Sequence, residues 1–197
     1  MKHLPHHERR ARIVRGAMAA FARSGFRGTR SRDLARAAGV SEALIFKHFP
    51  NKRALQKAII EERLRQSGPF LPRELYTAPL GEALQAVAAR VIQLSGRDPD
   101  FMRLLYYSGL EREALAPMFF KRRVTESISE VSGLVRVWIR RRWVRKSVDP
   151  LLFAWSFMSC LFQLMTARHI FGVRRLSGRS GDLSKMVADL FLQGIQA

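Results

Sequence analysis

The sequence is poor in cysteine and in residues that could form a catalytic or metal site. It has a single cysteine, Cys160, in 197 residues, so no internal disulfide framework can form. No Cys/His pair lies at zinc-ligand spacing, so we expect neither a metal nor a cofactor. No nucleophile with a neighbouring base and no pair of acidic catalytic residues stands out. We therefore expect a cytoplasmic protein without enzymatic activity.

Strand patterns are also absent, because no run of alternating β-branched residues lies between turn residues. Apolar residues recur at spacings of three and four instead, which predicts an all-α protein. The chain is 47% hydrophobic and 26% charged, with a mean hydropathy of -0.11. This composition is typical of a folded globular protein and excludes general disorder.

No apolar stretch of signal-peptide length lies in residues 1–25, so nothing marks the chain for export. The most apolar segment, residues 151–167, includes Ser156, Ser159, Gln163 and Thr166. It is shorter than the roughly 20 residues that a membrane-spanning helix needs. We expect a buried or subunit-interface helix there, and no membrane partner.

Positive charge is in excess. The chain has 35 Lys and Arg residues against 16 Asp and Glu residues, giving a net charge of +19 and a pI near 11.5. Such a charge indicates a polyanionic partner, with nucleic acid favoured over an anionic membrane. The charge is densest at the start, since residues 1–65 hold 16 basic and 5 acidic side chains.

A segment rich in proline and glycine, residues 67–79, divides the chain. We place a domain boundary there, between a domain of residues 1–65 and one of residues 66–197. The first domain is predicted to have a helix that ends at Ser24–Gly25, followed by helices over 31–38, from Ser41 to Pro50, and over 52–65. The helices predicted for the second domain lie near 81–95, 99–113, 117–146, 149–171 and 182–196.

Residues 31–49, SRDLARAAGVSEALIFKHF, have the features of a helix-turn-helix. Two short helices that cross steeply need a small side chain at the crossing, and Ala35 provides it. Gly39 follows at the turn, where a positive φ is cheap only for glycine. Leu34, Val40 and other apolar residues fall on the inward faces. The segment therefore predicts a DNA-binding motif.

Residues 9–57 resemble the DNA-binding domain of the TetR family of transcriptional regulators. The matching residues are Ile13, Ala17, Phe21, Gly25, Phe26, Thr29, Asp33, Leu34, Ala35, Ala38, Gly39, Val40, Ser41, Leu44, Ile45, Phe46, His48, Phe49, Lys52 and Leu55. The resemblance implies an N-terminal helix-turn-helix domain of three to four helices and a C-terminal helical domain for effector binding and dimerisation. It further implies a homodimeric repressor that a small molecule releases from a palindromic operator in double-stranded DNA.

The resemblance also assigns DNA contacts. It places Thr29 and Ser31 at a phosphate, Arg32 at a guanine edge and Lys52 on the backbone. The predicted contacts on the third helix are Ser41, Glu42, Ala43, Leu44, Phe46, Lys47 and His48. Two positions depart from the family. Phe46 replaces the usual tyrosine and loses one phosphate hydrogen bond, and Arg30 replaces a threonine, which leaves open which residue caps the second helix.

The second domain is expected to dimerise the protein, because one helix-turn-helix reads only one half-site. The predicted interface residues are Leu152, Trp155, Ser159, Gln163, Leu183, Val187, Leu190 and Phe191. Packing of these faces inside one subunit is the alternative. An apolar or anionic effector is expected in a pocket lined by Phe101, Tyr106, Tyr107, Phe119, Trp138, Trp155, Met158 and Phe162. Ordinary core packing is the alternative for these residues.

Residues 135–146, VRVWIRRRWVRK, place cations four residues apart, where they repel one another unless anions are near. This run is either a solvated face or a site for an anionic effector such as an acyl-CoA or a carboxylate.

Two rival functions also explain the net charge: sequence-independent packaging of nucleic acid, and association of a basic helical protein with a membrane surface. Packaging leaves the large apolar second half without a purpose, and membrane association does not explain the helix-turn-helix register.

Overall fold

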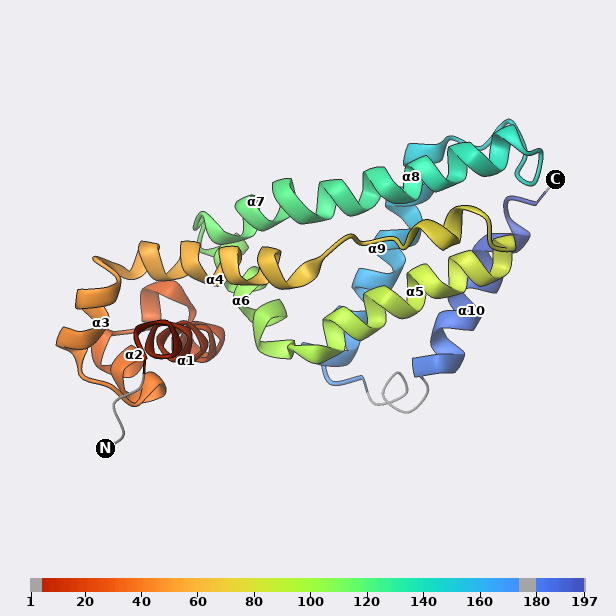
Figure 1. The fold of residues 1–197 in the computed structure, drawn as a ribbon. Helices are drawn as coiled ribbons and strands as arrows, with labels where there is room; N and C mark the ends of the chain where they lie inside the picture. Colours follow the sequence, from red (N-terminus) through yellow and green to blue (C-terminus); the bar gives the residue numbers. More distant parts are fainter. Residues whose placement is uncertain (1–4, 174–179, 197) are drawn as a thin grey trace. The chain divides into compact units, whose positions relative to one another are not determined.

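The computed structural model describes residues 5–173 and 180–196, and every named element in those ranges is helical (Figure 1). Within these residues the only extended pairing is an isolated antiparallel bridge between Val144 and Gln196. The predicted all-α fold is confirmed.

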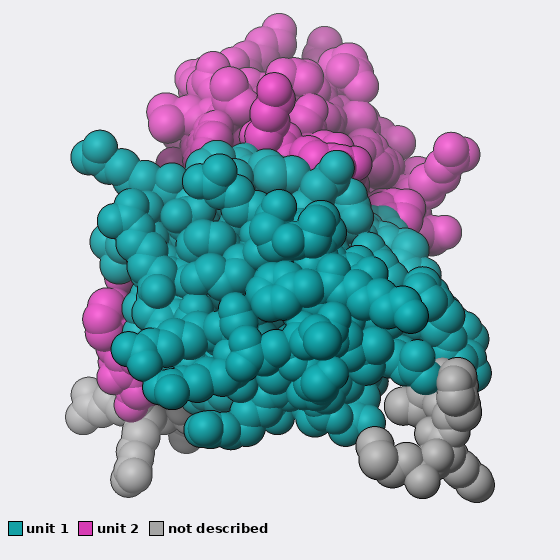
Figure 2. All heavy atoms as spheres, turned by 90° about the vertical axis from the view of Figure 1, so that its left-hand side faces the viewer, with its two compact units in different colours: residues 1–68, 100–120 teal, residues 69–99, 121–197 magenta. Residues whose placement is uncertain are grey.

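The chain forms two compact units (Figure 2). The first comprises residues 1–68 and 100–120, and the second comprises residues 69–99 and 121–197. The predicted boundary at 65/66 lies close to the first junction between the units. The prediction assigns residues 100–120 to the second domain, whereas the structure places them in the first unit. These residues belong to the first unit because Phe101, Leu104 and Leu115 are buried in the same core as the N-terminal helices.

The first unit contains α1 (His6–Gly28), α2 (Ser31–Ala38), α3 (Glu42–His48), α4 (Lys52–Ser67), α6 (Pro99–Leu110) and α7 (Leu115–Phe119). Large side chains from α1 to α4 are less than 2% exposed in its core, among them Ile13, Phe21, Leu34, Ile45 and Leu55. The short helices α2 and α3 therefore derive their stability from this shared core, because isolated helices of this length are unstable in water.

The second unit contains the 3-10 helix η1 (Arg73–Tyr76), α5 (Leu80–Arg97), α8 (Thr125–Arg140), α9 (Pro150–His169) and α10 (Ser180–Gln193). A π-helical turn, η2 (Phe120–Val124), leads into α8. Helix α5 packs against α9 and α10, and α8 packs against α9. Trp138, Phe157 and Leu84 are among the fully buried side chains between these helices.

Residues with positive φ mark the end of α8 and a kink in α1. The helix predicted over 117–146 ends at Arg140, because Arg142 adopts a left-handed conformation with φ of 62°. The chain beyond it runs beside the C-terminal segment, where Arg145 N donates to Ile195 O at 3.1 Å. The predicted end of the first helix at Gly25 is a kink inside α1, where Gly25 has a φ of 68° and the helix continues to Gly28.

Helix α9 is the one described helix that is long and apolar enough to cross a membrane. One face of it is buried in the second unit through Phe153, Phe157, Leu161 and Met165. This burial is what the sequence analysis predicts for a core helix. Its opposite face is exposed, and Leu152 on that face has 66% of its surface accessible.

Candidate nucleic-acid interface

The crossing of α1 and α2 sets the position of the helix-turn-helix. Ala35 and Ala38 are buried there, as the sequence predicts. Gly16 on α1 lies against them so closely that an added Cβ would be 2.6 Å from the backbone of Ala38. Sequence reasoning missed Gly16, because a helical glycine gives no sign of which backbone it contacts.

The turn between α2 and α3 contains Gly39 in the left-handed conformation, with φ of 62°. Gly39 N donates to Arg36 O at 3.2 Å, and Val40 N donates to Ala35 O at 3.1 Å. These bonds satisfy carbonyls at the end of α2 and fix the angle at which α3 leaves it. The guanidinium of Arg12 donates to Gly39 O at 3.3 Å, so α1 also holds the turn.

Helix α3 has one buried and one exposed face. Ser41 caps its start by accepting from Leu44 N at 3.2 Å, and Ile45 and Phe49 are 1% and 2% exposed. The six predicted groove-facing residues lie outside this core: Glu42, Ala43, Phe46 and Lys47 are exposed, while Leu44 and His48 are partly exposed. Phe46 is 40% exposed, so it offers an apolar surface where a tyrosine hydroxyl is missing.

The start of α2 is built differently from the prediction. Thr29 is 1% exposed, and its hydroxyl donates to Gly25 O at 2.5 Å. This hydroxyl joins the end of α1 to α2 and faces the interior, where it cannot reach a phosphate. Ser31 is partly exposed and Arg32 is exposed. At the start of α2 the side-chain capping contact is made by Asp33, because its carboxylate accepts a hydrogen bond from Arg30 N at 3.0 Å.

Lys52, at the start of α4, is held by the end of α1. Its ammonium donates to Phe26 O at 2.8 Å and to Thr29 O at 2.9 Å, and it lies 4.5 Å from the centre of the Phe26 ring. A cation at this place neutralises the carbonyls at the end of a helix. Lys52 is only partly exposed, so its first role is to fix the loop that leads into α2.

Cations surround this surface. A hollow of about 470 Å³ beside α1 and α2 is lined by Arg12, Arg15 and Arg36. At the other end of α3, the rings of His6 and His48 are 4.6 Å apart. Burial and then the nearby His6 and Arg9 lower the pKa of His48 below its ordinary value. The free protein therefore carries closely spaced positive charge that an approaching phosphate would neutralise.

Comparisons with known proteins agree with this geometry. The model described as bacterial regulatory proteins of the tetR family matches residues 13–59. The uncharacterized HTH-type transcriptional regulator YvkB of Bacillus subtilis is 25% identical over 189 residues, which are 94% of this chain and 96% of that protein. The chain is a DNA-binding transcriptional regulator whose residues 13–59 match the TetR family.

Solved structures extend this TetR-family likeness in fold over the full length. A TetR-family regulator from Mesorhizobium loti has a TM-score of 0.74 at 20% identity and covers 99% of this chain and 100% of its own. FadR from Bacillus subtilis, solved in complex with stearoyl-CoA, has a TM-score of 0.71 at 17% identity, over 94% of this chain and 99% of its own.

The first unit contains a further contact that sequence reasoning missed. Glu111, after α6, accepts a hydrogen bond from Phe26 N at 2.7 Å, and Arg27 donates to Glu111 O at 3.3 Å. The carboxylate takes the place that a side chain at Gly25 would fill, since an added Cβ there would be 2.4 Å from it. Residues far apart in sequence thus hold the end of α1 together.

The structure divides the predicted effector-pocket residues between the two units. Phe101, Tyr106, Tyr107 and Phe119 belong to the first unit, and Trp138, Trp155, Met158 and Phe162 belong to the second. Phe101 and Phe119 pack edge to face at 5.0 Å, Trp138 and Met158 are buried, and the two tyrosines and Trp155 are exposed. Burial within its own unit accounts for each of Phe101, Trp138 and Met158 as a core residue.

The predicted interface residues also divide into two groups. Leu152, Trp155, Ser159 and Gln163 on α9 and Leu190 on α10 are exposed, and Leu183 is partly exposed. Val187 is 5% exposed, and the ring of Phe191 packs against Phe153 and Phe157 at 5.7 and 5.0 Å. Val187 and Phe191 therefore pack within their own subunit. Met186, on the same helix as Leu190, is 65% exposed.

Proposed function

We propose that this TetR-family protein is a repressor that binds a palindromic operator in duplex DNA as a homodimer and leaves it when a small molecule binds. The observation that carries the proposal is the two-sided α3, with Ile45 and Phe49 buried and the predicted base-contacting residues outward. A helix presented in this way by a neighbouring short helix is the arrangement that enters a major groove.

The proposed contacts follow from exposure. Lys47 and Arg32 are exposed and carry donors that match the acceptors of guanine. Ser31 lies at the start of α2, where free amides favour a phosphate. Glu42, Ala43, Leu44, Phe46 and His48 complete the groove-facing set, while Ser41 and Lys52 act through the caps that they form.

Exposed apolar side chains on α9 and α10 support the homodimer. Leu152 and Leu190 are each 66% exposed, and Met186 is 65% exposed. Large apolar side chains gathered on two helices favour burial against a partner. A second copy of the same face would bury them in a two-fold arrangement, which also brings two recognition helices to two half-sites.

Two buried donors in the second unit support a ligand there. The indole N–H of Trp138 and the hydroxyl of Ser132, both on α8, have no hydrogen-bond partner among the described residues. Buried donors without acceptors are costly, and a ligand with acceptor atoms would satisfy them. The likeness in fold to FadR, solved with stearoyl-CoA, favours an effector with an apolar chain and an anionic end.

Base preference tests the DNA contacts. The wild-type protein, Lys47→Ala and Arg32→Ala are each used to select duplexes from a randomised pool, with Lys57→Ala as the control for loss of one exposed cation on α4. We expect the first two variants to relax the preference at defined bases by about 1–3 kcal/mol per contact. Equal, unspecific losses for all three variants would remove the assignment of α3.

Light scattering tests the dimer. We expect the wild-type protein to have twice the mass of one chain, and Leu152→Glu with Leu190→Glu to be monomeric and to lose operator affinity. A monomeric wild-type protein that still binds a palindrome would overturn the proposed homodimer.

The proposed cytoplasmic location follows from binding to chromosomal DNA.

A further inference from the structure

The end of α8 carries a cluster of cations without acidic partners. Within residues 5–173 and 180–196, no ion pair is formed by Arg136, Arg140, Arg142 or Lys146. Two further arginines in this stretch are used to hold the chain. Arg141 donates to Tyr76 O at 2.9 Å, and Arg145 donates to Gly194 O. The remaining cations repel one another, and an anion among them would relieve the repulsion.

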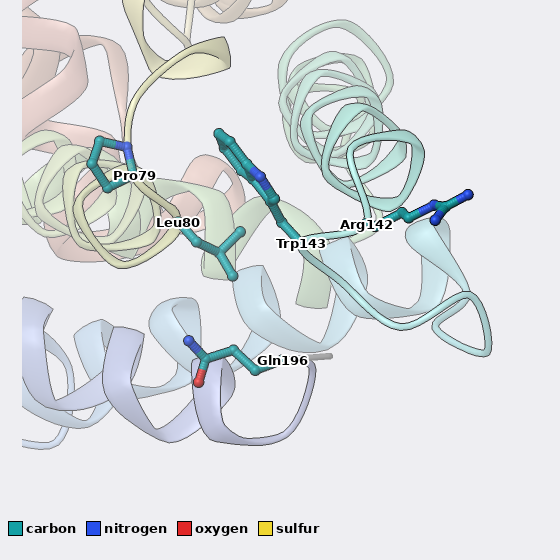
Figure 3. A pocket seen from close by; sticks show the side chains of 5 residues that line it. All are labelled: Pro79, Leu80, Arg142, Trp143 and Gln196. Carbon is teal, nitrogen blue, oxygen red and sulfur yellow. The ribbon is translucent and has the colours of Figure 1, made fainter.

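A hollow of about 500 Å³ lies beside this cluster, lined by Pro79, Leu80, Arg142, Trp143 and Gln196. Figure 3 shows the ring of Trp143 extending toward Pro79 and Leu80, with the Gln196 side chain below Leu80, while the guanidinium of Arg142 points outward, away from these four side chains. Arg141 lies 5.0 Å from the centre of the Trp143 ring, yet 38% of this tryptophan remains exposed. The hollow therefore combines a flat aromatic wall with a lining arginine, Arg142, whose charge lies outside it.

The backbone at Arg142 is held in an unfavourable form. Arg142 has a φ of 62°, a conformation that glycine adopts freely and arginine rarely adopts. Its N–H donates to Ile139 O at 3.0 Å, and Trp143 N donates to Trp138 O at 3.0 Å, so the helix ends in a defined turn. An arginine where glycine would be more stable points to a role for its charge.

We propose that this hollow binds an anionic small molecule with a flat ring, the chemistry of a nucleotide. The ring would stack on Trp143 beside Leu80 and Pro79, and the negative groups would extend outward to Arg142, the cation of this cluster that lines the hollow. The proposal concerns binding at this surface alone. It holds whether or not the ligand changes operator affinity, so it does not depend on the proposed repressor function.

The test is a titration of the full chain with ADP, followed by tryptophan fluorescence and by calorimetry. We expect a saturable fluorescence change and a saturable heat of binding in the wild-type protein, no saturable heat in Trp143→Ala, and weaker binding of tripolyphosphate, which has no ring, and of adenosine, which has no charge. A response to tripolyphosphate as strong as that to ADP would identify an unspecific polyanion surface and overturn the proposal. No saturable binding of ADP would overturn it as well.

Arg142→Gly separates a binding role from a structural one. Glycine accepts the left-handed conformation, so we expect this variant to unfold at a higher temperature while its affinity for ADP falls by about two- to fivefold, the size of an exposed ion pair. Arg97→Gln, which removes one exposed cation at the end of α5, is the control and should bind ADP like the wild-type protein. Unchanged affinity in Arg142→Gly, or an equal loss in Arg97→Gln, would overturn the proposal.

Discussion

Removal of the Glu111 carboxylate is expected to loosen the end of α1, where α1 passes into the helix-turn-helix. Glu111 accepts from the partly buried Phe26 N at 2.7 Å, while its contacts to Arg27 N are long at 3.4 Å. The short bond involves a charged acceptor and is the one that should matter. In Glu111→Ala the N–H of Phe26 loses its acceptor, and water replaces it only in part.

The expected loss in the free energy of unfolding is about 2 kcal/mol, the usual contribution of a hydrogen bond to a charged group. For a protein of this size, that loss lowers the Tm by about 4–8 °C. Glu111→Gln keeps an acceptor oxygen without the charge and should lose about half as much. Thermal and urea unfolding at neutral pH measure both variants.

The control is Glu113→Ala, which removes a nearby carboxylate whose side chain makes no hydrogen bond or ion pair among the described residues. It should leave the Tm within about 1 °C of the wild-type value, as surface substitutions usually do. If Glu111→Ala is as stable as Glu113→Ala, the carboxylate does not hold the end of α1 and the reasoning is refuted.

Three further predictions follow from single residues. Gly16→Ala should cost about 1–3 kcal/mol through overpacking against Ala38 and weaken DNA binding, whereas a fully stable variant would show that α1 and α2 can separate. Arg112→Gly should raise the free energy of unfolding by about 1 kcal/mol, because Arg112 has a φ of 56°; a less stable variant would contradict this. The pKa of His48 is lower in the folded protein than its ordinary value of 6.5, so its neutral form stabilises the fold above pH 6.5. This stability is lost as the pH falls through the folded pKa, and His48→Asn should abolish the dependence in urea unfolding. Phosphates favour the protonated form, so DNA affinity should instead rise as the pH falls, and a flat pH profile of the wild-type protein would count against a DNA contact at His48.

The helix-turn-helix was predictable from sequence because its determinants are local. Gly39 has the expected positive φ, and Ile45 and Phe49 are buried as their register predicts. The breaks at Pro50 and Pro79 mark helix boundaries because proline cannot continue a helix from the preceding residues. Periodicity and turn residues therefore predict most of the helices of this fold.

The features that sequence did not predict depend on distant residues or on unusual backbone. Glu111 reaches Phe26 across 85 positions, and no local pattern announces such a contact. Thr29 looked like a phosphate ligand, but its hydroxyl is used by Gly25 O. The end of α8 was placed too late because Arg142, unlike glycine, gives no signal for a left-handed residue.

Sequence-specific recognition of duplex DNA by α3 is tested most directly by selection of bound fragments from the source genome. The purified protein is mixed with genomic fragments at near-physiological salt, and the bound fraction is sequenced. A dimer that presents two copies of α3 should recover a shared palindrome, with half-sites about one helical turn or a multiple of it apart. Fragments that share no motif would contradict the account and favour charge-driven packaging of nucleic acid.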